Sequence, residues 1–147
     1  MDLNSEGSSP PFPIIYHSPY AYLISNINIA FKSKKRINVI ICTKKVLRLL
    51  RALRKEGCVS YLLLGYQNSY RRRLVFSLYY YRQTTFFKHI QLLSTISKKF
   101  TVSLKALVIL DRSLKHTVLL LETSNGIINH KEALKQRTGG LMLCLIS

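Results

Sequence analysis

The chain ends in two apolar segments, VLLLETSNG (residues 118–126) and GGLMLCLI (residues 139–146), joined by a short basic stretch. The first segment breaks into a turn made of residue types that favour sharp bends, namely Thr123, Ser124, Asn125 and Gly126. We predict a strand over 118–123, a short helix over His130–Gln136 and a closing strand over 141–146. Hydroxyls, an amide and backbone N–H groups at such a turn can bind phosphates and riboses without a charge of their own.

The composition points to a folded, strongly basic protein. Of its 147 residues 48% are hydrophobic, enough to bury a core, and 23 Lys and Arg face only 6 Asp and Glu, a net charge of +17. Such a charge favours a polyanionic partner, and nucleic acid is favoured over an anionic membrane surface. No apolar run approaches the ~18–20 residues that a membrane span needs.

Residue types that carry catalysis or bind metals are scarce and scattered. The three cysteines are isolated in sequence, so we expect buried thiols in a reducing compartment rather than disulfides or zinc ligands: Cys42, Cys58 and Cys144. The four histidines lack metal-ligand spacing, the six acids form no catalytic pair, and no nucleotide-binding motif occurs. We therefore predict no enzyme activity, no cofactor, no metal and no small-molecule substrate.

The first half reads as an extension followed by two helices. Residues 1–17 are rich in Pro and Ser and lack Lys and Arg, which predicts a retained flexible extension rather than an import signal. Ser18 and Pro19 mark a helix start, a basic loop covers 32–36, and Ile37–Ile41 reads as a strand. Thr43 is the predicted N-cap of the clearest helix, residues 44–56, which Gly57 ends.

That helix carries its cations on one side. At about 100° per residue a narrow stripe forms from Lys44, Arg48, Arg51 and Lys55, opposite the apolar residues. Solvated faces usually mix charges that pair at i, i+4, and here only Glu56 is acidic. We favour phosphate contact over simple solvation for the stripe.

The remaining segments predict a mostly β second half. We expect strands at 58–64 and 71–81 around a turn at 65–69, a strand at 87–93, a turn at Ser97, Lys98 and Lys99, and a short strand from Phe100. Residues 103–110 are ambiguous between strand and helix. Tyr79, Tyr80 and Tyr81 are compatible with base stacking, but core packing is favoured because neighbouring strand residues alternate faces. The predicted fold class is α+β, with an N-terminal α/β lobe (18–83) and a C-terminal mostly β lobe with a short helix (84–147), divided near 82–85.

Several of these segments resemble the bacterial-type small-subunit ribosomal protein eight family. The turn at 123–126 and the Gly139-Gly140 pair are similar to its C-terminal signature, Ser18-Pro19-Tyr20-Ala21 to its opening helix, and Arg54-Lys55-Glu56-Gly57 to the end of its second helix. The resemblance covers about residues 18–147 and is loose over 62–95. Glu122 stands where the family has the first serine of its turn, Leu141 replaces an acid, and the first helix has Asn26 and Asn28 in place of an arginine-rich pattern.

The resemblance implies a structural protein of the small ribosomal subunit, here expected in a mitochondrion rather than a plastid or a bacterium. It implies binding to a helical junction in the central domain of small-subunit rRNA, support of assembly and translation, and contact with neighbouring ribosomal proteins. The expected RNA-binding residues are Thr123, Ser124, Asn125, Gly126, Gly139, Gly140, Lys131, Ser97, Lys98, Lys99, Thr43, Lys44, Lys45, Arg48, Arg51, Lys55 and Arg36. The alternatives are a basic DNA-binding or nucleoid-type protein and, less favoured, a peripheral membrane protein.

Overall fold

The computed structural model describes residues 18–147 apart from 69–70, 81–86 and 96. These residues form four helices and two antiparallel sheets, which confirms the α+β class. Within them, no helix is long and apolar enough to cross a bilayer. The N-terminal extension expected at 1–17 lies outside the described residues.

The first half contains the two helices that its capping residues predict. Helix α3 (Pro19–Ser33) begins where the Ala21 N–H donates to Ser18 Oγ at 3.3 Å. After strand β1 (Ile37–Ile41), helix α4 (Lys44–Lys55) begins where the Val46 N–H donates to Thr43 Oγ1 at 3.2 Å. The apolar side of each helix is buried, because its hydrophobic residues recur at helical spacing.

The first sheet has the order β1-β3-β2, with β2 at Val59–Asn68 and β3 at Arg71–Leu78. The turn predicted at 65–69 is wrong for 65–68, because β2 continues to Asn68, with a register shift between Tyr66 and Asn68. Ladder hydrogen bonds come from the backbone, so pairing with β3 overrides the turn preference of this polar segment. Strand β3 ends at Leu78, three residues earlier than predicted, which leaves Tyr79 and Tyr80 outside it; Tyr81 lies outside the described residues.

The second half forms a sheet of order β4-β8-β6-β7, with β5 also paired to β8. Its elements are β4 (Ile90–Leu92), β5 (Thr101–Val102), α5 (Leu104–Ser113), β6 (Val118–Thr123), β7 (Gly126–Asn129), α6 (His130–Gln136) and β8 (Gly140–Ile146). The ambiguous segment at 103–110 is thus helical, and the Ala106 N–H donates to Ser103 Oγ at its start. Strand β4 is shorter than the predicted 87–93, and β7 was not predicted.

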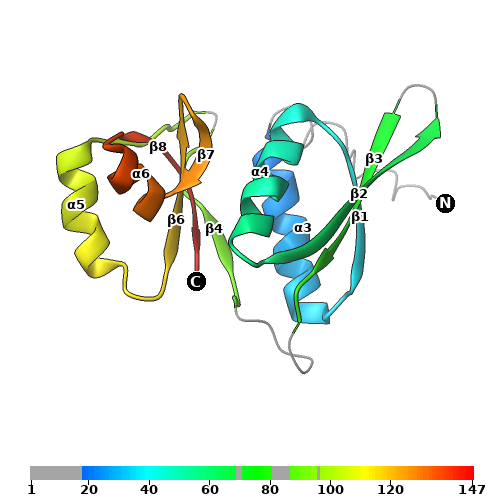
Figure 1. Cartoon of the computed structure of the whole chain (residues 1–147). Helices are drawn as coiled ribbons and strands as arrows, with labels where there is room; N and C mark the ends of the chain where they lie inside the picture. The colour runs from blue at the N-terminus through cyan, green and yellow to red at the C-terminus, as the bar shows by residue number, and fades with distance from the viewer. Residues whose placement is uncertain (1–17, 69–70, 81–86, 96) are drawn as a thin grey trace.

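The elements stack in four layers, visible from right to left in Figure 1: the first sheet, helices α3 and α4, the second sheet, and helices α5 and α6. The second sheet is therefore covered on both faces, which explains why β6 and β8 are almost wholly apolar. A register shift opposite Leu120 and Leu121 places both Leu143 and Cys144 on the face toward α3 and α4. Met142 and Leu145 pack instead on the α5–α6 side.

One hydrophobic cluster joins the two halves. It contains Leu23 and Ile27 of α3 and Leu49 of α4 together with Leu120 and Ile146 of the second sheet. The lobe boundary predicted at 82–85 lies outside the described residues. Helices α3 and α4 therefore share a core with the second sheet, and the lobe bounds of 18–83 and 84–147 stay a prediction.

Candidate nucleic-acid interface

A groove of about 490 Å³ opens where the two lobes meet. It is lined by Ser18, Pro19, Tyr20, Thr43, Lys44, Lys45, Ser94, Thr95, Lys99, Glu122, Leu141 and Leu143. The first residues come from the starts of α3 and α4, and the others from the second lobe. Both helices thus begin at the groove, where the positive ends of their dipoles favour an anion.

The groove brings together four of the predicted site residues. Thr43, Lys44 and Lys45 lie on one wall and Lys99 on the other, and all three lysines are exposed. Sequence reasoning missed Ser94 and Thr95, which line the same groove. The one signal for them was the run of hydroxyl residues just before Lys98 and Lys99.

The loop that carries Lys98 and Lys99 is fixed to the second sheet. Ser94, 7% exposed, donates its hydroxyl to the Met142 carbonyl and accepts the Phe100 N–H at 3.1 Å. The Thr95 N–H donates to the Lys98 carbonyl at 2.7 Å, and the Lys98 N–H donates to Thr95 Oγ1 at 3.1 Å. These bonds confirm a turn at this position and present Ser97, Lys98 and Lys99 to solvent.

Glu122 turns toward the first lobe. Its Oε1 accepts a hydrogen bond of 3.4 Å from the Tyr20 hydroxyl, whose ring lies 5.9 Å from Lys45 Nζ. Burial, followed by the negative charge of Glu122 and this hydrogen bond, raises the pKa of Tyr20 to about 12. The Glu122 carboxylate, at the position of the family's serine, thus accepts a hydrogen bond from the Tyr20 phenol. This bond connects the two lobes across the groove.

The turn between β6 and β7 is closed by Thr123. Its hydroxyl donates to the Gly126 carbonyl at 3.0 Å and accepts the Asn125 N–H at 3.1 Å. Gly126 has φ +101, a conformation that favours glycine. Thr123 therefore organises the turn, whereas Ser124, Asn125 and the Gly126 backbone are exposed at its tip, with Asn125 Nδ2 donating to Gln136 Oε1.

The glycine pair at the start of β8 is explained by packing inside the protein. A Cβ on Gly140 would lie 2.8 Å from the Glu122 carbonyl oxygen and 2.9 Å from Thr123 Cγ2. A Cβ on Gly139 would meet the Val102 carbonyl of β5. These glycines permit close backbone approach between strands, and Gly140 lies directly against Glu122 and Thr123.

The cationic stripe on α4 is exposed along its whole length, at Lys44, Arg48, Arg51 and Lys55. The stripe starts at the groove and ends beside the second lobe, where Asn129 Nδ2 donates to Glu56 Oε1 at 2.7 Å. Asn129 is also the N-cap of α6, whose first turn carries the exposed Lys131. Lys55 and Lys131 thus lie close in sequence to the two residues, Glu56 and Asn129, that join α4 to the second lobe.

Arg36 does not join this group. It precedes β1 and lies near the C-terminal end of α3, whereas the groove lies at the N-terminal end of that helix. With 1.5 Å per residue, the 15 residues of α3 separate the two places by about 20 Å.

The arrangement suits binding of a polyanion. Cations from α4 and from the loop at 97–99 border a groove that also offers hydroxyls and two helix starts. In the part of the chain that the structure describes, no three His, Cys, Asp or Glu residues converge as metal ligands. Cys58 and Cys144 are almost fully buried, and this burial raises the pKa of each thiol to about 12.

Comparison with known proteins identifies a family for this chain. No curated protein matches the chain significantly. The family model described as ribosomal protein S8 matches residues 18–147, which include both lobes, the groove, the α4 stripe and the glycine pair. Members of this family are structural proteins of the small ribosomal subunit that bind rRNA and contact other ribosomal proteins. Since the match spans nearly the whole chain, we conclude that the chain belongs to the ribosomal protein S8 family.

Proposed function

We propose that the protein binds a helical junction in the central domain of small-subunit rRNA and fixes that junction during assembly, in a mitochondrial ribosome. The observation that carries this proposal is the groove at the lobe junction, with the exposed α4 stripe running from it. A junction presents phosphates on several converging strands, and cations from two lobes can neutralise them together.

The exposed turn supplies the shape-specific contacts. Ser124, Asn125 and the Gly126 backbone offer a hydroxyl, an amide and backbone groups at the tip of the β6–β7 hairpin. Phosphate contacts from the lysines would position the protein, and these neutral groups would read ribose and backbone geometry. The Thr123 hydroxyl bonds to Gly126 and Asn125 within the turn, which would lower the cost of ordering these contact groups on RNA binding.

The mitochondrial assignment is supported by composition. The body of the chain is rich in Leu, Ile, Tyr, Phe, Lys and Ser, a bias that suits an AT-rich genome such as that of an organelle. Fractionation of cells that express the tagged protein tests this part. Co-sedimentation with mitochondrial small subunits is expected, and co-sedimentation with plastid or cytoplasmic ribosomes alone would refute it.

Crosslinking of the tagged protein in its native compartment, followed by sequencing of attached RNA, tests the junction. Reads concentrated on one central-domain junction, with crosslinked peptides from 43–55 and 123–126, are the expected result. Diffuse RNA reads, or mainly DNA, would refute the junction proposal and favour a nonspecific basic protein. A variant with Lys105→Gln and Arg112→Gln, two exposed cations on α5, is the matched control and should crosslink as the wild type does.

A further inference from the structure

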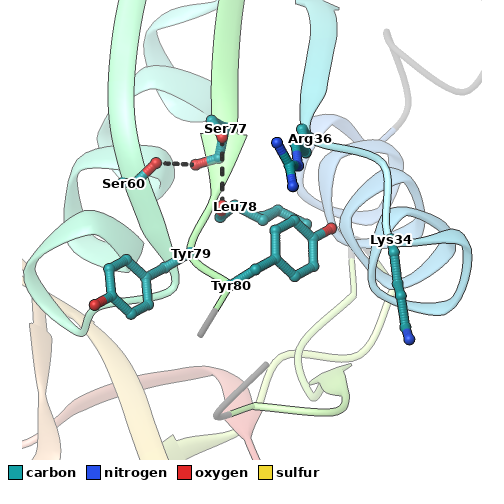
Figure 2. Close-up of a pocket in the computed structure, with 7 residues that line it drawn as sticks. All are labelled: Lys34, Arg36, Ser60, Ser77, Leu78, Tyr79 and Tyr80. Carbon is teal, nitrogen blue, oxygen red and sulfur yellow. Dashed lines mark hydrogen bonds between the residues drawn. The ribbon is translucent and has the colours of Figure 1, made fainter. Parts of the chain in front are cut away.

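A second cavity, of about 670 Å³, opens at the end of the first sheet where β1 begins and β3 ends. Figure 2 shows its lining residues, Lys34, Arg36, Ser60, Ser77, Leu78, Tyr79 and Tyr80. It lies at the C-terminal end of α3, about 20 Å from the groove at the other end of that helix. The RNA interface proposed above therefore leaves this cavity unassigned.

One wall of the cavity is an aromatic ring held in place. The Tyr80 hydroxyl lies 3.1 Å from the Ala30 carbonyl oxygen and 2.9 Å from the Lys35 carbonyl oxygen. The hydroxyl therefore donates its hydrogen to a carbonyl at the end of α3. Burial raises the pKa of Tyr80, which keeps this hydroxyl protonated and donating. Tyr79, the neighbouring aromatic, is 44% exposed. The cavity thus has one tyrosine that is hydrogen-bonded to the end of α3 and a second whose side chain is partly exposed to solvent.

The cavity is also cationic. Lys34 and Arg36 are exposed, and neither forms an ion pair with any residue that the structure describes. The Lys34 and Lys35 N–H groups donate to the Ala30 carbonyl, so the end of α3 is satisfied by the protein itself. In Figure 2 the Arg36 guanidinium points toward the Tyr80 ring, whereas the Lys34 side chain points away from that ring at the end of the helix. Both cations remain available to an anionic ligand.

The polar floor of the cavity offers acceptors. Ser60 Oγ donates to the Ser77 carbonyl at 3.2 Å, and Ser77 Oγ donates to the Leu78 carbonyl at 3.3 Å, as the dashed lines in Figure 2 show. Because these bonds use both hydroxyl hydrogens, the oxygens retain lone pairs that can accept an N–H from a ligand.

We propose that this cavity binds an unstacked nucleotide from a single-stranded segment of RNA. Its phosphate is held by Arg36, with Lys34 at the rim, and its base stacks on the exposed ring of Tyr79 beside Tyr80. The inference rests on the proposed RNA-binding function but assigns a separate surface. Paired bases in a duplex do not expose their faces, whereas single strands combine a charged backbone with faces that stack on aromatic side chains. Lys34 and Arg36 alone would suit an acidic peptide as well as a nucleotide. The two neighbouring tyrosines, Tyr79 and Tyr80, favour a ligand that carries a base.

Titration of the full-length protein with fluorescein-labelled pentauridylate, followed by anisotropy, tests the site. Tyr79→Leu should weaken binding about tenfold, which lies within the range that stacking on an aromatic ring contributes per base. Tyr79→Phe, which keeps the ring, should stay within about twofold of the wild type. Arg36→Gln should weaken binding and reduce the salt dependence, whereas Lys105→Gln on α5 is the exposed-cation control.

Crosslinking locates the ligand independently of affinity. With 5-bromouridine in the pentanucleotide, irradiation should attach RNA to the peptide that contains Tyr79 and Tyr80. Crosslinks confined to 43–55 or 97–99, or unchanged affinity in both Tyr79→Leu and Arg36→Gln, would overturn the inference. Displacement of the pentanucleotide by hexaglutamate at equal concentration would also overturn it, because the cavity would then recognise charge alone.

A parallel titration with the rRNA junction separates this inference from the proposed function. If the wild type binds the junction but pentauridylate crosslinks elsewhere, only the cavity assignment fails. If pentauridylate crosslinks at Tyr79 or Tyr80 while the junction is bound no better than random duplex RNA, the cavity assignment is supported and the junction proposal fails.

Discussion

The side-chain amide of Asn28 pairs with the backbone of Ile90 as a neighbouring strand would. Asn28 Nδ2 donates to the Ile90 carbonyl at 2.8 Å, and the Ile90 N–H donates to Asn28 Oδ1 at 2.9 Å. Ile90 begins β4, the edge strand of the second sheet, and Asn28 lies on α3 in the first lobe. Asn28 is one of the two asparagines that replace the family's arginine-rich pattern on this helix, and it joins the two halves of the protein.

Replacing Asn28 with Ala should therefore destabilise the protein. Both hydrogen bonds would be lost and two backbone groups of Ile90 left without these partners, so we expect a loss of ~1–3 kcal/mol in the free energy of unfolding by urea. Asn26→Ala is the matched control, because among the described residues the Asn26 side chain donates to the Tyr22 carbonyl within α3 and makes no hydrogen bond to the second half. Equal destabilisation by the two variants would show that the Asn28–Ile90 hydrogen bonds add no stability beyond that of an ordinary hydrogen bond within α3.

Gly140→Ala should destabilise the protein through a steric clash. The new Cβ would lie within 3 Å of the Glu122 carbonyl and of Thr123 Cγ2, both in a sheet that cannot easily move. We expect a loss of ~1–3 kcal/mol, as for other overpacked sites. Differential scanning calorimetry of the purified variant measures it.

Gly57 offers the control for that variant, because it has open space around it but φ +86. Gly57→Asn should carry only the strain of the left-handed conformation, which Asn tolerates better than most residues, whereas Gly140→Asn should be at least as destabilising as Gly140→Ala. If Gly140→Asn is tolerated, close strand approach is not the reason for this glycine.

The parts of this fold that sequence predicted well are those set by local chemistry. Helix α4 starts at Lys44 as predicted because the Thr43 hydroxyl caps it and the Lys-Val-Leu-Arg-Leu-Leu pattern has helical period. In contrast, 103–110 was ambiguous because a nearly continuous apolar run fits either a buried strand or a helix. Strand β7 was missed because Gly126–Asn129 is short and forms only by pairing with β6.

The groove could be predicted only in part. Its cations were visible as a stripe and a basic turn, but Tyr20 and Glu122 are 102 residues apart and meet through tertiary packing. The sequence showed Glu122 only as an acid close to expected phosphate contacts. Its partner became apparent once the two lobes were placed together, because no short-range pattern encodes an interlobe hydrogen bond.

The protein should lose stability at alkaline pH. Burial is the main cause that raises the pKa of Tyr20, Cys58 and Cys144 to about 12 each. A raised pKa means that the folded state retains these protons more strongly than the unfolded state. Their contribution is thus complete below about pH 9, the ordinary thiol value, and is lost as pH rises toward 12. The urea midpoint should fall between pH 9 and 11.

Tyr20→Phe separates the groove from the buried thiols in that experiment. The variant lacks the titrating phenol, so its stability should fall less between pH 10 and 11 than that of the wild type. A wild-type midpoint that rises over this range would contradict the direction of all three shifts.

The two hydroxyls at the β6–β7 turn should respond differently to removal. Thr123→Val removes the bonds to Gly126 and Asn125 and should lower stability by ~1 kcal/mol. Ser124→Ala removes an exposed hydroxyl and should leave stability unchanged while weakening junction binding. The double variant Thr123→Ala, Ser124→Ala should lose ~1–3 kcal/mol of binding in a filter assay. Unchanged affinity with an intact fold would remove this turn from the interface.

Neutralising the start of the α4 stripe should change how salt affects RNA binding. Lys44→Gln with Arg48→Gln removes two exposed cations, one at the groove and one a turn further along. If both contact phosphates, the slope of log K against log salt should become shallower by about 2, because each contact releases counterions. Titrations of the rRNA junction at several salt concentrations measure the slope.

The control for this prediction lies on the opposite side of the second sheet. Lys105 and Arg112 are also exposed, and they lie on α5, which Figure 1 shows on the outer layer away from α4. Their double replacement by Gln lowers the net charge by the same amount, so a general field effect would reduce both slopes alike. A reduction confined to the Lys44 and Arg48 variant would mean that phosphates lie against α4. Equal slopes in the two variants would mean that the stripe is only a solvated face.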